Sequence, residues 1–150
     1  MRICVVGGTG LIGSAVADAL SERHEVVRVG NSSGEARVDI GSKASIEEMY
    51  GAIGPVDAVA SAAGRAAFGD LGELSDDDFR LGLENKLMGQ VNLVRVGLDH
   101  VSDGGSFTLV SGILSREPTP GSAAVSPANA GLEAFARAAS LEMPRGLRVN

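Results

Sequence analysis

The segment that decides the fold is Ile3-Cys4-Val5-Val6-Gly7-Gly8-Thr9-Gly10-Leu11-Ile12-Gly13. Its first four residues form a short, continuous apolar run, which is typical of a strand buried on both faces. The glycines that follow read G-x-G-x-x-G from Gly8, or G-x-x-G-x-x-G from Gly7. Apolar residues then recur at helical spacing as far as Ser21. The segment therefore predicts a buried strand, a glycine turn and a helix over residues 11–21.

A glycine turn between a buried strand and a helix favours binding of a pyrophosphate. Glycines permit the tight turn and let the backbone approach the phosphates, while the free N–H groups and the dipole of the helix N-terminus attract negative charge. Chance glycines in an ordinary strand-to-helix turn would give the same letters, so the argument rests on the flanking strand and helix. The predicted nucleotide-binding residues here are Gly7, Gly8, Thr9, Gly10, Leu11, Ile12 and Gly13.

Outward from this turn, segments with the apolar pattern of a strand alternate with segments of helical spacing. Further strands are expected over residues 25–29, 36–40, 56–60, 106–111 and 147–150. Helices are expected from Ser42 or Ser45 to about residue 53, over 76–101 and over 123–143. This alternation predicts an α/β fold: a doubly wound parallel sheet with helices on both faces, which is a three-layer αβα arrangement of the Rossmann type.

Composition limits the classes of function. The 150 residues suit a single domain, and the excess of 19 acidic over 13 basic residues disfavours nucleic acid or an anionic membrane as a partner. One Cys and two His cannot build a Cys/His zinc cluster, so no metal site is expected. No apolar run approaches the roughly 18 residues of a membrane span, and a signal-peptide pattern is missing. We expect a cytoplasmic protein.

The residues after the second expected strand bear on the choice of nucleotide. An Asp or Glu at this point would bind the 2′-hydroxyl of the adenosine ribose. The chain has Asn31, Ser32 and Ser33 instead, which leave no carboxylate to repel a 2′-phosphate, and Arg28 or Arg37 could add positive charge. This position favours NADP, while a plain polar loop would look the same and NAD stays possible.

The whole chain resembles the short-chain dehydrogenase/reductase family. The residues that carry the resemblance are the Gly7–Gly13 turn, Asp39-Ile40, Ser61-Ala62-Ala63-Gly64, Leu87-Met88-Gly89, Leu109-Val110-Ser111, Gly131-Leu132-Glu133-Ala134-Phe135 and Pro144–Asn150. The resemblance implies that Asp39 and Ile40 lie against the adenine, and that Ala62, Ala63 and Gly64 lie beside the adenosine ribose. It further implies a homodimer or homotetramer. It also implies that the single NAD(P)-binding domain over residues 1–150 is truncated within its sixth strand.

The catalytic residues of that family are only partly present. The family uses a Ser to orient the substrate carbonyl, a Tyr to donate the proton and a Lys four residues later to lower the pKa of the Tyr. Ser111 matches the Ser, but the register of the Tyr-x-x-x-Lys pair falls on Val125 and Asn129. The only tyrosine, Tyr50, belongs to a different expected helix. The chain therefore lacks the usual proton donor.

Lys86 offers a compensation for the missing pair. In the family, an Asn of the long helix stands three residues before a Gly. Gly89 places Lys86 at the position of that Asn, and Asn129 stands at the position of the family's catalytic Lys. These two positions face each other across the site in the family. We expect Lys86 to serve the cofactor ribose or to supply the proton, with Ser111 and Asn129 as its catalytic partners. The alternative is a lysine on a solvated helix face.

Two functions follow from these residues. The first is an NAD(P)-dependent oxidoreductase that transfers a hydride between nicotinamide and a small carbonyl or alcohol substrate, with a non-standard proton donor. The second is a dinucleotide-binding protein without turnover, such as a redox-sensing regulator, which the missing Tyr favours. An epimerase or lyase relative would also need the Tyr.

Overall fold

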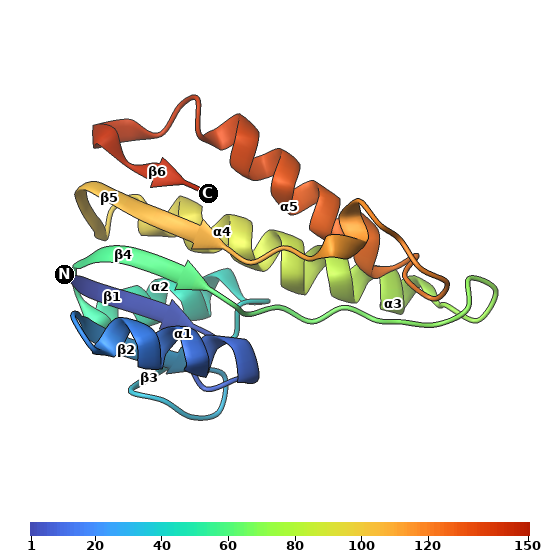
Figure 1. The fold of residues 1–150 in the computed structure, drawn as a ribbon, viewed down its shortest axis with the longest axis horizontal. Helices are drawn as coiled ribbons and strands as arrows, with labels where there is room; N and C mark the ends of the chain where they lie inside the picture. Colours follow the sequence, from blue (N-terminus) through green and yellow to red (C-terminus); the bar gives the residue numbers. More distant parts are fainter.

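A single parallel sheet forms the centre of the molecule, which a computed structural model describes over all 150 residues. The strand order is β3-β2-β1-β4-β5-β6 (Figure 1). The strands are β1 Arg2–Val6, β2 Glu25–Gly30, β3 Ala36–Arg37, β4 Val56–Ser61, β5 Val101–Leu109 and β6 Arg148–Val149. The direction of winding reverses between β1 and β4, and ligands of such sheets bind at the carboxyl ends of the strands beside this point. The predicted α/β fold is confirmed.

Helices cover both faces of the sheet. Helix α1 (Leu11–Ser21) lies on one face, and α2 (Lys43–Ile53), α4 (Met88–Gly97) and α5 (Val125–Ala139) lie on the other (Figure 1). Alternate residues of β1 serve the two faces, as the strand geometry requires. Cys4 and Val6 belong to the large core under α2 and α4, whereas Ile3 and Val5 pack towards α1.

The only tyrosine is part of the large core. Tyr50 of α2 is fully buried, and its hydroxyl donates a hydrogen bond to the carbonyl of Leu93 at 2.9 Å. Its ring stacks on His100 with a centroid distance of 5.0 Å. Burial raises the pKa of Tyr50 well above its ordinary value, so the phenol stays neutral. Tyr50 therefore has a structural role.

The prediction of one continuous helix over residues 76–101 is wrong in its detail. The chain forms the short helix α3 (Asp76–Arg80), a π-helical segment (Leu81–Leu87) and α4, and the helix ends at Gly97. The π-helical segment lies close to the start of α5: a Cβ on Gly82 would lie 3.0 Å from the carbonyl oxygen of Ala124. The apolar spacing of the sequence does not distinguish α from π geometry.

Two strands and the last helix also differ from expectation. β3 has only two residues. The chain leaves the sheet after it, because the backbone N–H of Asp39 donates to Ser45 Oγ at the start of α2. β5 starts at Val101, and its register with β4 shifts between the pairs Val56–Val101 and Ala58–Ser106. β5 ends at Leu109, so Ser111 lies two residues beyond it. Helix α5 covers 125–139, which is shorter than the expected range of 123–143.

Candidate nucleotide-binding and active site

The glycine turn after β1 has a geometry that only glycine permits. Gly7 has a φ of +82°, in the left-handed region, and its N–H donates to the carbonyl of Val29 at 2.8 Å. The N–H of Gly10 donates back to the carbonyl of Gly7 at 2.9 Å. A Cβ added to Gly13 would lie 2.0 Å from that same carbonyl oxygen. The turn therefore packs tightly between β1, β2 and the start of α1.

The N-terminus of α1 is open towards the carboxyl ends of the strands. Gly10 caps the helix without a side-chain hydrogen bond, and the first turn contains no acidic residue. The first N–H groups of a helix have no partners within it, and they carry the positive end of its dipole. Leu11 and Ile12, in this turn, are 92% and 58% exposed. This helix end is suited to bind an anion.

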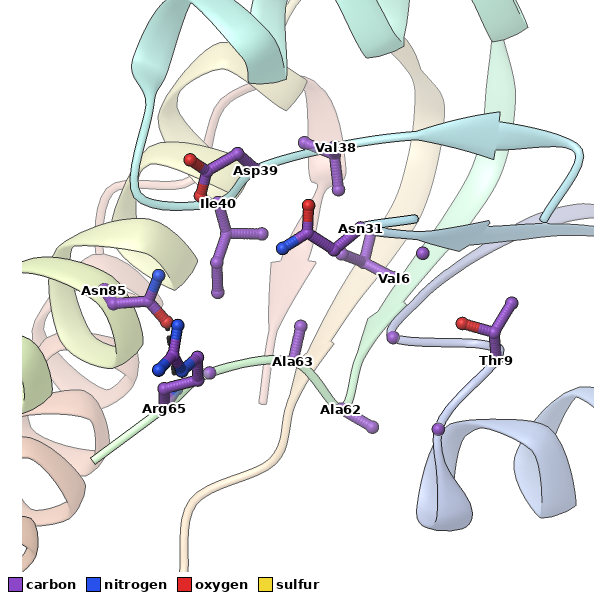
Figure 2. Close-up of a pocket in the computed structure, with 14 residues that line it drawn as sticks. Val6, Thr9, Asn31, Val38, Asp39, Ile40, Ala62, Ala63, Arg65 and Asn85 are labelled. Atoms are coloured by element: carbon purple, nitrogen blue, oxygen red, sulfur yellow. Dashed lines mark hydrogen bonds between the residues drawn. The ribbon is translucent and has the colours of Figure 1, made fainter. Parts of the chain in front are cut away.

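A cavity of about 230 Å³ lies in front of the glycine turn. It is lined by the segments that follow β1, β2, β3 and β4, together with one residue of the π-helical segment. Figure 2 shows Asn31, Ile40 and Ala63 converging on it, with Thr9 on one side and Arg65 with Asn85 on the other. The predicted nucleotide-binding residues that line this cavity are Gly7, Thr9, Gly10, Asn31, Asp39, Ile40, Ala62, Ala63 and Gly64.

Five further residues line the cavity and were missed from the sequence: Val6, Gly30, Val38, Arg65 and Asn85. Arg65 is the only basic residue among the lining residues. Its backbone N–H donates to Asn85 Oδ1 at 2.9 Å, which ties the loop after β4 to the π-helical segment. Arg65 directly follows the Ser61–Gly64 stretch and Asn85 directly precedes Lys86, so adjacency in sequence was the available signal.

The remaining predicted nucleotide-binding residues lie outside the cavity. Gly8 and Gly13 are buried beneath the turn. Leu11 and Ile12 are exposed in the first turn of α1, and Ser32 and Ser33 are exposed on the loop between β2 and β3. Arg28 does not supply a free charge near this loop, because its guanidinium pairs with Asp18 of α1 at 2.7 Å.

Lys86 lies against the wall of the cavity. A Cβ on Gly64, which has a φ of +138°, would lie 2.6 Å from Lys86 Cγ, so the two residues are in direct contact. The ammonium group of Lys86 forms no ion pair or hydrogen bond within the chain. Burial lowers the pKa of this half-buried side chain below its ordinary value. The side chain of Lys86 therefore packs on the loop after β4, and its ammonium is unpaired.

Ser111 and Asn129 meet at the end of β5. Ser111 Oγ lies 3.2 Å from the carbonyl oxygen of Asn129, to which it can donate. Asn129 is 2% exposed, its Oδ1 has no hydrogen-bond partner, and its Nδ2 packs on Gly112. Val125, in the register of the family's Tyr, is buried one helical turn earlier. The structure thus brings Ser111 and Asn129 together and provides no acid in the Tyr position.

Glu133 is a polar residue of this region to which the sequence reasoning gave no role. Its Oε1 accepts from Ser111 at 3.1 Å and from Ser115 at 2.5 Å, and its Oε2 accepts from the Arg116 guanidinium at 3.1 Å. The hydrogen bonds from Ser115 and then from Arg116 lower the pKa of the Glu133 carboxyl. The available signal was its position four residues after Asn129, which places both on one helix face.

A second hollow, of about 500 Å³, lies between the loop after β5 and the start of α5. Its lining includes Leu71, Ser115, Thr119, Pro120 and Gly121. No charged residue lines it, and it adjoins the Ser111 region through Ser115. This hollow is suited to an uncharged, partly apolar molecule.

None of the helices has the length and apolar character to cross a membrane. His, Cys, Asp and Glu side chains do not gather anywhere in groups of three or more that could hold a metal ion.

A family model described as Enoyl-(Acyl carrier protein) reductase matches residues 6–150. The chain belongs to the short-chain dehydrogenase/reductase family of oxidoreductases, as its sequence pattern indicated. None of the curated proteins compared with the chain matches it.

Several solved structures share this fold. The protein lin1944 from Listeria innocua is 43% identical, with a TM-score of 0.98, over 100% of this chain and 75% of its own. A small-chain dehydrogenase in complex with NADPH is 28% identical, with a TM-score of 0.88, over 96% of this chain and 65% of its own. A short-chain dehydrogenase from Burkholderia cenocepacia J2315 in complex with NADP is 21% identical, with a TM-score of 0.88, over 97% of this chain and 70% of its own, which shows a shared fold.

Proposed function

We propose that this protein is an NADP(H)-dependent oxidoreductase that acts on a small, uncharged carbonyl or alcohol substrate. The observation that carries the proposal is the glycine turn, which opens the N-terminus of α1 onto a cavity at the carboxyl ends of β1, β2, β3 and β4. This arrangement can hold both a pyrophosphate and an adenosine.

The residues around the cavity fit such a cofactor. A Cβ at Gly7 would lie 2.9 Å from the backbone of Ala62, so the turn and the loop after β4 leave no room for larger residues. In our proposal the first turn of α1 holds the pyrophosphate, while Asp39 and Ile40 flank the adenine. Asn31, without a carboxylate beside it, faces the 2′ position. The NADPH complex of a 28% identical relative supports the preference for NADP(H) over NAD(H).

The catalytic residues that we propose are Lys86, Ser111 and Asn129. When bound, the nicotinamide supplies or accepts the hydride. Lys86, whose ammonium has no partner in the chain, would hold the cofactor ribose or move the proton. Burial lowers the pKa of Lys86, which makes its ammonium a readier proton donor. Ser111 and Asn129 would hold the substrate oxygen from the α5 side. The uncharged hollow beside Ser115 would take the rest of the substrate.

Two measurements test this proposal. NADPH should raise the midpoint of thermal unfolding more than NADH does, because a ligand that binds only the folded state stabilises it. Oxidation of NADPH should then be followed across a panel of aldehydes, ketones and quinones. Binding of NADPH without turnover of any substrate would contradict the enzyme and favour a redox-sensing regulator. The absence of binding would contradict both functions.

Replacement of Lys86 tests its assignment. We expect Lys86→Ala to lower kcat/KM by about tenfold or more, since loss of a positioned proton-transfer group typically costs 10²–10⁴-fold and loss of a ribose contact costs less. Lys43→Ala is the matched control, because Lys43 is the only other lysine and pairs with Glu47 on the surface of α2. Equal activity of the two variants would remove Lys86 from the site.

A further inference from the structure

The hydroxyl of Ser111 is committed as a hydrogen-bond donor within the protein. Its two partners are the carboxylate oxygen of Glu133 at 3.1 Å and the carbonyl oxygen of Asn129 at 3.2 Å. A carbonyl oxygen can only accept, and so can an ionised carboxylate. Since a hydroxyl carries one proton, Ser111 uses that proton towards one of these two groups. Only the lone pairs of Oγ stay free for a ligand.

Glu133 is held in the ionised, acceptor-only form by its other neighbours. Ser115 Oγ lies 2.5 Å from Oε1, and the Nε and Nη2 atoms of Arg116 lie 3.2 Å and 3.1 Å from Oε2. Hydrogen bonds to the charged form of a carboxyl favour that form. The carboxylate therefore receives donors on both oxygens and has no proton to return to Ser111.

We propose that Glu133 is a positioning residue that fixes Ser111 as a hydrogen-bond acceptor, so that the site prefers a ligand which donates a hydrogen bond at this point, such as an alcohol. This inference rests on the proposed function and specifies which member of the alcohol/carbonyl pair the site binds more tightly. It also departs from the expectation that Ser111 donates to a carbonyl. A carbonyl oxygen beside Ser111 would face lone pairs, whereas an alcohol hydroxyl would face an acceptor.

The variant Glu133→Gln weakens this polarity with little change in shape. Arg116 has only donors to offer, so the remaining oxygen of the amide stays towards Arg116. The amide nitrogen then points towards Ser111 and Ser115 and donates to Ser111. The carbonyl of Asn129, 3.2 Å from Ser111 Oγ, is then the only acceptor within the chain for the proton of Ser111. A ligand carbonyl can compete for that proton with one acceptor instead of two, so the preference for a donor should weaken.

The experiment uses two unreactive probes on the protein saturated with NADPH. Trifluoroethanol is a strong donor, and N,N-dimethylacetamide presents a carbonyl that only accepts; the Kd of each follows from the change in NADPH fluorescence. We expect the ratio of the two affinities to favour trifluoroethanol in the natural sequence. Glu133→Gln should shift it about threefold or more towards dimethylacetamide, since the amide nitrogen occupies a lone pair of Ser111 that trifluoroethanol would use, and one acceptor fewer holds the proton of Ser111.

Two controls separate positioning from support of the fold. Arg116→Ala removes the same ion pair but keeps the carboxylate, so the affinity ratio should stay as in the natural sequence. Ser111→Ala should abolish the preference, and Glu133→Gln should then have no further effect on the ratio. An unchanged ratio in Glu133→Gln, a shift that persists without Ser111, or no binding of either probe would overturn the inference. Failure of NADPH itself to bind would refute the proposed function instead. The affinity ratio of the two probes, measured on the cofactor-free protein by NMR titration, would then decide the role of Glu133.

Discussion

Gly13 and Glu133 show which residues of the site a sequence can reveal. Gly13 touches Gly7, six residues away, so the pattern that specifies the contact is contiguous and was predicted from the chain alone. Glu133 touches Ser111 and Ser115, 22 and 18 residues away, across a loop whose path no local pattern determines. Lys86 is intermediate, because a register with Gly89 predicted its slot, while its contact with Gly64 required the fold.

The glycine turn should tolerate no added methyl group at Gly13. A Cβ there would lie 2.0 Å from the carbonyl oxygen of Gly7, and backbone cannot move aside as a flexible side chain can. We expect Gly13→Ala to lower the free energy of unfolding by about 1–3 kcal/mol, the usual cost of overpacking, and to abolish stabilisation by NADPH. Urea titrations with and without NADPH measure both effects.

Gly51→Ala is the matched control for this substitution. Gly51 lies inside α2, and a Cβ there would meet nothing within 4 Å. Alanine is the better helix former, so this variant should gain about 0.5–1 kcal/mol and keep its response to NADPH. A Gly13→Ala protein as stable and as responsive as Gly51→Ala would contradict the packing that the structure assigns to the turn.

At the scale of elements, helices and strands were located well and their interiors less well. The spacing of apolar residues from Leu83 onwards predicted a helix in the correct place, but spacings of three and four residues suit both α and π turns. The π-helical segment depends on contacts with α5, where Gly131 packs against Leu87, and such tertiary contacts are invisible in a local pattern. Helix starts were more predictable. Ser42, one of the two expected starts, caps α2, and α3 begins at Asp76 as expected, with Ser75 as its cap.

The cap of α3 should have a pH dependence that the cap of α2 lacks. Ser75 and Asp78 form a reciprocal capping box, and the hydrogen bonds from Ser75 lower the pKa of Asp78. Because the pKa of Asp78 is lower in the folded state, its carboxylate stabilises the folded state fully at pH values above the unfolded pKa of about 3.9. This stabilisation is lost as the pH falls through the folded pKa. Ser75→Ala should cost about 1 kcal/mol at pH 7, and this cost should shrink below about pH 4.

Ser42→Ala provides the comparison for this pH effect. Ser42 accepts from the N–H of Ser45 at 3.3 Å, and no acidic residue lies in the first turn of α2. Its cost should also be about 1 kcal/mol and should stay constant from pH 7 to pH 3. Urea unfolding of the three proteins at both pH values gives the comparison. Parallel losses for both variants would show that Asp78 does not take part in the cap.

At the scale of the whole molecule, the strand order explains why residues so far apart in sequence share one cavity. All strands are parallel, so the segments after β1, β2, β3 and β4 emerge at the same edge of the sheet. The alternation of strands and helices was enough to predict this edge. The expected strands over 25–29 and 36–40 also left no room for a helix between them, and β2 and β3 are indeed joined by a loop of five residues. This loop leaves α1 without a neighbouring helix on its face (Figure 1).

Binding of NADPH should therefore protect one edge of the molecule and not the other. A ligand at 100 times its Kd stabilises the folded state by about 2.7 kcal/mol, and local opening next to the ligand becomes correspondingly rarer. We expect slower amide hydrogen exchange in residues 7–13, 31–40 and 62–65, which surround the cavity. Residues 102–105 form the irregular part of β5, between the paired residues Val101 and Ser106, at the opposite edge of the sheet. Their exchange should not change. Protection at both edges to the same degree would point to global stabilisation by a site elsewhere, and protection at residues 102–105 alone would refute the cavity as the nucleotide site.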